Sequence, residues 1–128
     1  MIKQIKYWLF LFSALLLVWL PSVHAGPGNF SYSSAEKTAS AAIATSGGYL
    51  HGIVVITDGT NSVTVDIYDN ASAATGTKLI PQWVVTTSSS NRAQSYSIEP
   101  PIKFSNGIYV AVTTSGTVTY MVYYFEGL

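Results

Sequence analysis

Hydrophobic and polar residues alternate along most of the chain after residue 48, in short segments that turn residues separate. Segment 62–68 (SVTVDIY) shows the pattern best, because every second residue is branched and apolar and the residues between are polar. This period of two is typical of a strand with one buried face. Segment 49–57 (YLHGIVVIT) is apolar on both faces at positions 53–56, which predicts a central strand. Three side chains of segment 62–68 are expected to face the core: Val63, Val65 and Ile67.

Two turns in this pattern predict hairpins. The residues Asp58-Gly59-Thr60-Asn61 separate segments 49–57 and 62–68, and Ser115-Gly116 separates 108–113 (IYVAVT) from 117–125 (TVTYMVYYF). Glycine adopts positive φ without a Cβ penalty, and aspartate hydrogen-bonds the turn backbone. We therefore expect antiparallel hairpins over residues 49–68 and 108–125.

The remaining segments have weaker strand patterns. Segment 37–45 (KTASAAIAT) predicts a first strand of small side chains, with a helix as the competing interpretation. Segment 78–87 contains Pro81, which lacks the backbone donor of a central ladder, so this strand is expected to lie at an edge or to begin after Pro81. Segment 93–98 is expected to end before the pair Pro100-Pro101.

These segments amount to seven or eight strands, with turns at the spacing of a two-layer β protein. Val, Ile, Thr, Tyr and Ser dominate this part of the chain, and residues that favour helices are scarce. The sequence therefore predicts an all-β domain over residues 36–128, after a flexible leader at 26–35. The expected fold is an antiparallel β-sandwich, either jelly-roll or immunoglobulin-like. The chain has no cysteine, so packing and hydrogen bonds alone must stabilise it.

The first 25 residues have the layout of a secretory signal peptide. Lys3 and Lys6 precede an uncharged apolar run of 14 residues, and Pro21-Ser22-Val23-His24-Ala25 follows it. We place the cleavage after Ala25. A membrane-spanning helix needs roughly 20 residues, so we expect no stable membrane span after cleavage. The product is expected in the periplasm, outside the cell or on the cell surface.

Charge excludes one class of partner. The 128-residue chain has six basic and six acidic side chains, and beyond residue 25 four basic side chains face six acidic ones, a net charge of −2. A nucleic-acid-binding domain needs a basic patch, so no nucleic-acid partner is expected.

Candidate catalytic and metal-binding residues are few. His51 is the single histidine beyond residue 25, and its place in an apolar strand favours a packed or edge residue. Asp58, Asp66 and Asp69 are close in sequence, but the strand between Asp58 and Asp69 separates them, so we interpret them as turn residues rather than a Ca²⁺ site. We expect no catalytic residue, no metal and no cofactor, and therefore no enzyme.

The last strand contains the most aromatic residues. Its two-residue period predicts one face toward the core, at Val118, Tyr120, Val122 and Tyr124. The other face is expected to expose a set of candidate binding residues together with the neighbouring segment: Met121, Tyr123, Phe125 and Tyr109. Three interpretations remain open: cross-strand pairs covered by a loop or the leader, a subunit interface, or a sugar-stacking platform that Trp83 joins.

Several short motifs resemble a small β-sandwich type found in phage and bacterial proteins that are often grouped with virion structural proteins. They are G-x-L-x-G, V-x-I-Y-D-N-A, G-T-K-L, N-G-I-Y-V and V-x-Y-M-V-Y-Y, within residues 48–81 and 103–124. The motifs cover about half of the chain after residue 25 and consist of turns and alternating strands. The resemblance implies the fold and a structural role, and it implies no catalytic residue.

Together these features predict an exported, non-catalytic structural or adhesive protein. It is expected to form a homo-oligomer or filament, or to bind a surface partner, through the aromatic sheet face. Residues 26–46 are small and nearly uncharged, so two interpretations remain open: a strand that packs on its own domain, or a strand exchanged between subunits. The alternative is a carbohydrate-binding module that uses Tyr123, Tyr109 and Trp83 to bind a glycan.

Overall fold

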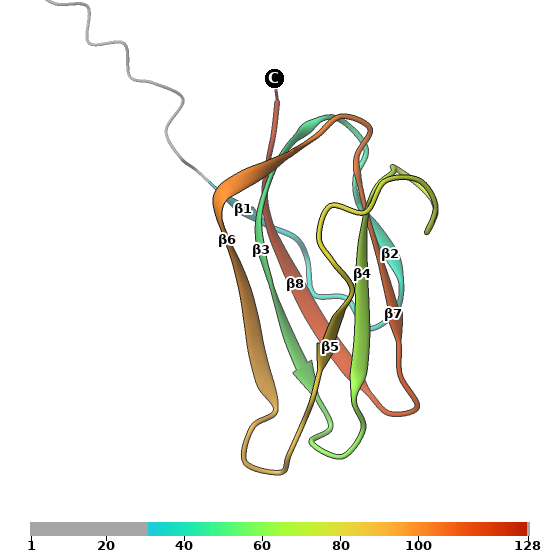
Figure 1. The fold of residues 1–128 in the computed structure, drawn as a ribbon, viewed down its shortest axis with the longest axis vertical. Helices are drawn as coiled ribbons and strands as arrows, with labels where there is room; N and C mark the ends of the chain where they lie inside the picture. Colours follow the sequence, from blue (N-terminus) through green and yellow to red (C-terminus); the bar gives the residue numbers. More distant parts are fainter. Residues whose placement is uncertain (1–30, 128) are drawn as a thin grey trace, which may run out of the picture.

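The computed structural model describes residues 31–127, which form eight β-strands and, within this range, no helix (Figure 1). The strands are β1 (Tyr32–Ser33), β2 (Ala41–Ala44), β3 (Gly48–Thr57), β4 (Val63–Asp69), β5 (Trp83–Val85), β6 (Ala93–Phe104), β7 (Ile108–Thr113) and β8 (Val118–Glu126). The predicted signal peptide, its cleavage site and residues 26–30 of the predicted leader lie outside the described residues. The rest of that leader contains β1, so the sandwich begins before residue 36.

The strands form two antiparallel four-stranded sheets, with the orders β1-β8-β3-β6 and β2-β7-β4-β5. Figure 1 shows the two sheets as facing layers. The predicted antiparallel β-sandwich is thus confirmed. The strand pairs are nested along the chain: β1 pairs with β8, β2 with β7, β3 with β6 and β4 with β5. The chain therefore folds back on itself between β4 and β5, and the resulting two-stranded ribbon wraps around the core. This is the jelly-roll order rather than the immunoglobulin-like one.

Both predicted hairpins are wrong. β3 and β4 belong to different sheets, and so do β7 and β8. Each short turn therefore crosses from one layer to the other instead of joining neighbours in one sheet. The local pattern does not distinguish the two arrangements, because alternating strands present an apolar face to the core in either case. Pairing with distant strands decides between them, since β8 and β6 occupy the two edges of β3.

Proline determines where two strands can lie. The edge position predicted for the strand after Pro81 is confirmed, because β5 begins at Trp83 and borders its sheet. The predicted stop at Pro100-Pro101 is wrong, since β6 continues to Phe104. β6 is also an edge strand, where a missing N–H group interrupts no interior ladder. Its register pairs Gly52 with Ser97 and Leu50 with Ile102, so both prolines lie in a bulge opposite His51.

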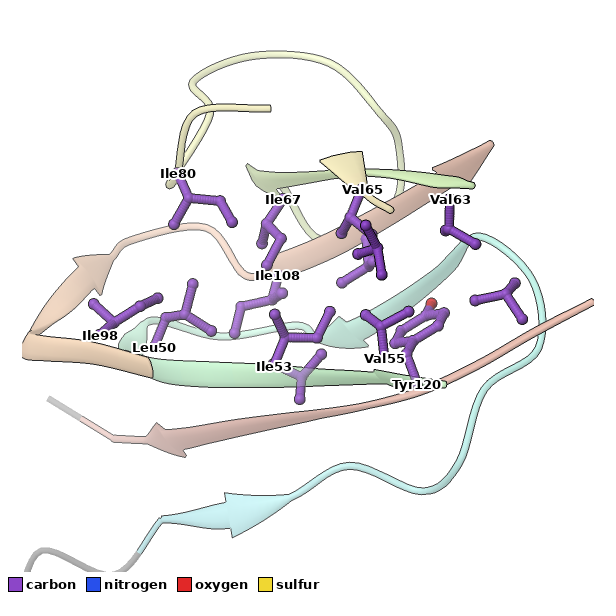
Figure 2. Packing of buried hydrophobic residues seen from close by; sticks show 14 of the residues in the cluster. Leu50, Ile53, Val55, Val63, Val65, Ile67, Ile80, Ile98, Ile108 and Tyr120 are labelled. Atoms are coloured by element: carbon purple, nitrogen blue, oxygen red, sulfur yellow. The ribbon is translucent and has the colours of Figure 1, made fainter. Parts of the chain in front are cut away.

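The core lies between the inner faces of the two sheets. The inward positions predicted for Val63, Val65 and Ile67 are confirmed, because all three are fully buried. Figure 2 shows side chains of both layers meeting here, with Ile80 from the β4–β5 loop covering one end. The prediction that β3 is central also holds, since it lies between β8 and β6. The buried apolar residues are Ala44, Leu50, Ile53, Val55, Val63, Val65, Ile67, Ile80, Val85, Ile98, Phe104, Ile108, Val110, Val118, Tyr120 and Val122.

Two isoleucines of β3 allow a matched test of this packing. Ile53 is 1% exposed, whereas Ile56 is 46% exposed on the other side of the sheet. Ile53→Ala should lower the free energy of unfolding by about 2–5 kcal/mol, because it opens a cavity between the layers. Ile56→Ala should lower it by less than roughly 1 kcal/mol. Urea unfolding of both variants measures the difference, and equal losses would contradict the assigned faces.

Candidate functional site

The outer face of the β1-β8-β3-β6 sheet is apolar and aromatic. The register of the two central strands pairs Phe125 with Tyr49 and Met121 with Val54. The predicted division of the last strand is confirmed, because Val118, Tyr120 and Val122 are buried while the residues between them are half-buried. We define the aromatic face as Tyr32, Tyr49, Val54, Ile56, Met121, Tyr123 and Phe125.

The aromatic face is partly covered by its own side chains. Tyr32 stacks on Phe125 with ring centroids 6.3 Å apart and an interplanar angle of 19°. Met121, Tyr123 and Phe125 are half-buried. Three other members remain exposed, with exposed fractions of 57% at Tyr32, 37% at Tyr49 and 46% at Ile56. The face therefore combines cross-strand pairs with apolar area that residues 31–127 leave uncovered.

A shallow groove of about 360 Å³ lies on the same side, where the register of β3 shifts between Leu50 and Gly52. Gly52 forms part of its lining, and a Cβ there would lie 2.5 Å from the carbonyl oxygen of Tyr96. The bulge therefore requires glycine. Among the residues that line the groove, five have hydroxyl, imidazole or phenol side chains: Ser31, Ser95, Ser97, His51 and Tyr123. Such groups can hydrogen-bond a polar ligand and stack against it.

The five predicted binding residues do not form one site. Met121, Tyr123 and Phe125 share the aromatic face, but Tyr109 pairs with Tyr68 on the outer side of the other sheet. Trp83 pairs with Val65 and packs inward on Tyr96, with ring centroids 5.5 Å apart. The expected common face depended on a hairpin over residues 108–125. Because β7 and β8 lie in opposite layers, the residues that the hairpin was to bring together lie on different sides of the domain.

Four members of the aromatic face were not among the predicted site residues: Tyr32, Tyr49, Val54 and Ile56. The sequence carried a signal for two of them. The run at positions 53–56 is apolar on both faces, and a two-residue period places Val54 and Ile56 opposite the core. We interpret this run as a central strand. Its two outward residues, Val54 and Ile56, also indicate an apolar outer surface. No local pattern placed the short β1 beside β8.

The carboxylate of Asp58 stabilises the turn after β3. It accepts hydrogen bonds from the backbone N–H groups of Thr60 and Asn61, at 2.8 Å each. The Asn61 side-chain amide and the Thr117 N–H group also donate to it, at 2.9 and 3.2 Å. Donation from Asn61, its backbone first, holds the pKa of Asp58 well below its usual range. Asp58 therefore joins the β3–β4 turn to the β7–β8 turn, both of which cross between layers.

Asp69 and Asp66 also serve the fold. Asp69 accepts hydrogen bonds from the N–H groups of Ser105 and Asn106, at 3.0 and 2.7 Å, in the β6–β7 turn. Asp66 forms an ion pair with Lys78 at 2.6 Å. Burial opposes ionisation of Asp66, but the bonds from Lys78 and Gln82 outweigh it and lower the pKa. As predicted, Asp58 and Asp69 lie at opposite ends of the β3–β4 region and act in turns.

No protein-family model, no curated protein and no solved structure matches this chain. Function is therefore inferred from the geometry of residues 31–127 and from the sequence. Within those residues, His, Asp and Glu side chains do not gather in groups of three that could hold a metal ion. The same range contains no helix of the length and hydropathy that crossing a membrane requires.

The hydrogen bonds of Asp58 predict a pH-dependent stability. Because folding lowers its pKa, its contribution is present above roughly pH 4, the unfolded value, and is lost as the pH falls toward the folded value. Asp58→Asn should therefore be less stable than the wild type at pH 7, and this difference should shrink between pH 4 and pH 2. Thermal unfolding across that range measures the difference. Ser62→Ala, in the same turn, should keep the wild-type pH dependence, and a constant deficit for Asp58→Asn would contradict the assignment.

Proposed function

We propose that this protein is an exported, non-catalytic structural or adhesive protein that self-associates, or binds a surface partner, through the aromatic face. The observation that carries the proposal is the exposed apolar area at Tyr32, Tyr49 and Ile56, continuous with the half-buried residues of β8. Among the paired strand residues, the register places one charged side chain beside it, Lys103, opposite Tyr49. An apolar surface with aromatic residues and little charge has the composition of an interface core.

A second copy of the chain fits this surface. Two sheets pack face to face at a spacing of about 10 Å when their side chains interdigitate, and the aromatic face is the outer side of such a sheet. A twofold axis would place the same face on both copies, so each apolar residue would meet a matching surface. If a second surface continues the contact, a filament results.

The remaining chemistry supports a binding role rather than catalysis. Asp58, Asp66 and Asp69 are engaged in hydrogen bonds that stabilise turns and the outer side of a sheet. His51 lies in the groove beside Tyr123 and serine hydroxyl groups. The amino-terminal layout of residues 1–25 supports export, and the resemblance to virion-type sandwiches supports a structural role.

Two pairs of tyrosines provide a matched test. The double substitution Tyr49→Ser and Tyr123→Ser should abolish self-association of residues 26–128, because it removes the aromatic rings of the proposed contact. The control is Tyr68→Ser with Tyr109→Ser, which removes two rings from the outer side of the opposite sheet and should leave association unchanged. Light scattering over a range of concentrations measures the assembly. Equal association of both double variants would refute a contact through the aromatic face.

The groove at Gly52 favours a second candidate function, that of a carbohydrate-binding module. Tyr123 offers a ring for stacking on the apolar face of a sugar, and Ser95, Ser97 and His51 offer hydrogen-bonding groups beside it. Trp83 and Tyr109 lie elsewhere and do not support this candidate. Its site is therefore smaller than the three-residue platform that the sequence indicated.

Glycan binding distinguishes the two candidates. If the groove is the site, a glycan array should detect binding by a monomer, and Tyr123→Ala should weaken it by about tenfold or more, roughly 1.4 kcal/mol. Tyr109→Ala, on the opposite sheet, is the control and should bind as the wild type does. Assembly of the wild type without glycan binding would instead favour the structural role.

A further inference from the structure

We propose that residues 31–44 form an edge segment that exchanges between two copies of this chain, each copy placing its own segment on the other. The inference deepens the proposed self-association, because it names the partner and the strands that receive it. In Figure 1 the segment runs from β1 in one layer to β2 in the other. It thus forms the edge strand of both sheets on one side of the domain.

The first half of the edge segment lies along β8 and is held by main-chain groups. Ser34 donates its N–H to the carbonyl oxygen of Val122 at 2.8 Å, and its hydroxyl accepts the Val122 N–H at 3.0 Å. Lys37 and Tyr120 exchange two backbone hydrogen bonds, at 3.0 and 2.8 Å. The Tyr120 hydroxyl then donates to the carbonyl oxygen of Ala39 at 2.9 Å. Apart from the Ser34 hydroxyl, these contacts recognise the extended backbone of the segment.

The second half of the edge segment repeats this arrangement on β7. The Ser40 hydroxyl accepts the N–H of Val112 at 3.0 Å and donates to the carbonyl oxygen of Val112 at 3.3 Å. Ala41 then pairs with Val110, and Ala42 pairs with Tyr109. A serine side chain thus completes the ladder near the start of each half. The segment can therefore attach to any free pair of β7 and β8 edges that has this spacing, including the pair on another copy.

The edge segment adds little to the core. Ala44 is its one member among the buried apolar residues of the described chain, and the half-buried Ile43 packs beside it. Figure 2 shows the labelled core side chains coming from the layers and the β4–β5 loop. Where the segment crosses between the layers, at Thr38–Ser40, it borders an open hollow of about 600 Å³. Removing the segment therefore opens two sheet edges, while the other buried apolar residues of the described chain all lie outside it.

The link to β3 is short enough to act as a hinge. Residues 45–47 (Thr-Ser-Gly) connect β2 in one layer to β3 in the other. Two hydrogen bonds hold the link, from Thr45 N–H to the Glu126 carboxylate at 3.3 Å and from Gly127 N–H to the Gly47 carbonyl at 3.1 Å. If the link extends, the segment leaves its own domain. Exposed edges accept strands from neighbours, and an identical segment remakes the hydrogen bonds that residues 31–44 form with β7 and β8.

Cross-linking between different copies tests the exchange, because the chain has no cysteine and introduced thiols are the only ones present. One full chain carries Ala42→Cys and another carries Tyr109→Cys, positions that face each other in the β2·β7 pair. The two proteins are unfolded, refolded together at high concentration and oxidised. We expect at least tenfold more mixed disulfide than in a control mixture of A42C with S95C, whose second thiol lies on the opposite sheet.

A mixed disulfide at the control level would overturn the exchange. Light scattering on the same mixture separates this failure from failure of the proposed function. A dimer without the mixed disulfide overturns the exchange and leaves association through the aromatic face standing. A folded monomer without it contradicts both.

A second variant does not depend on introduced thiols. Deletion of Ser46 and Gly47 shortens the link so that the edge segment no longer reaches β7 and β8 of its own domain, whereas it can still reach another copy. We expect the dimer to become at least tenfold more populated than in the wild type at equal concentration. A variant that stays folded and monomeric overturns the proposal.

Discussion

Both edges of β3 are occupied, by β8 on one side and by β6 on the other, and the rest of the structure depends on this pairing. β3 has no free edge for β4, so the turn at Asp58 must carry the chain to the opposite layer. Because β8 pairs with β3, it lies in the other sheet from β7, and the β7–β8 turn must also cross between the layers. Since β8 and β3 are neighbours, their outward side chains form one continuous surface, which is the aromatic face.

Polar groups make these crossings possible without a disulfide. A turn between layers leaves backbone N–H groups without ladder partners, and such groups need acceptors. Asp58 supplies them at one end of the sandwich and Asp69 at the other. At the sheet edges, the hydroxyl groups of Ser34 and Ser40 likewise accept backbone N–H groups, in place of the carbonyl oxygens of a neighbouring strand. Asp58 and Asp69 therefore serve the fold.

Local chemistry was sufficient for part of this structure. The alternation of segment 62–68 correctly assigned Val63, Val65 and Ile67 to the core, because a two-residue period determines the face of a strand whichever neighbours it acquires. Pro81 correctly indicated an edge, since its missing N–H group acts at one position. Pro100 and Pro101 did not end β6, because an edge strand with a bulge accommodates residues that an interior strand excludes.

By itself, the sequence determined that the described chain is built of strands, that Val63, Val65 and Ile67 are buried and that Asp58 and Asp69 hold turns, because these properties depend on the local sequence. Only the tertiary structure decided which strands are partners. It placed Tyr109 and Tyr123 on opposite sides of the domain, turned Trp83 inward and brought Tyr32 onto Phe125. The physical reason is that strand pairing joins residues far apart in the chain, so many registers satisfy one alternating pattern. The packing of all eight strands around one core selects among them.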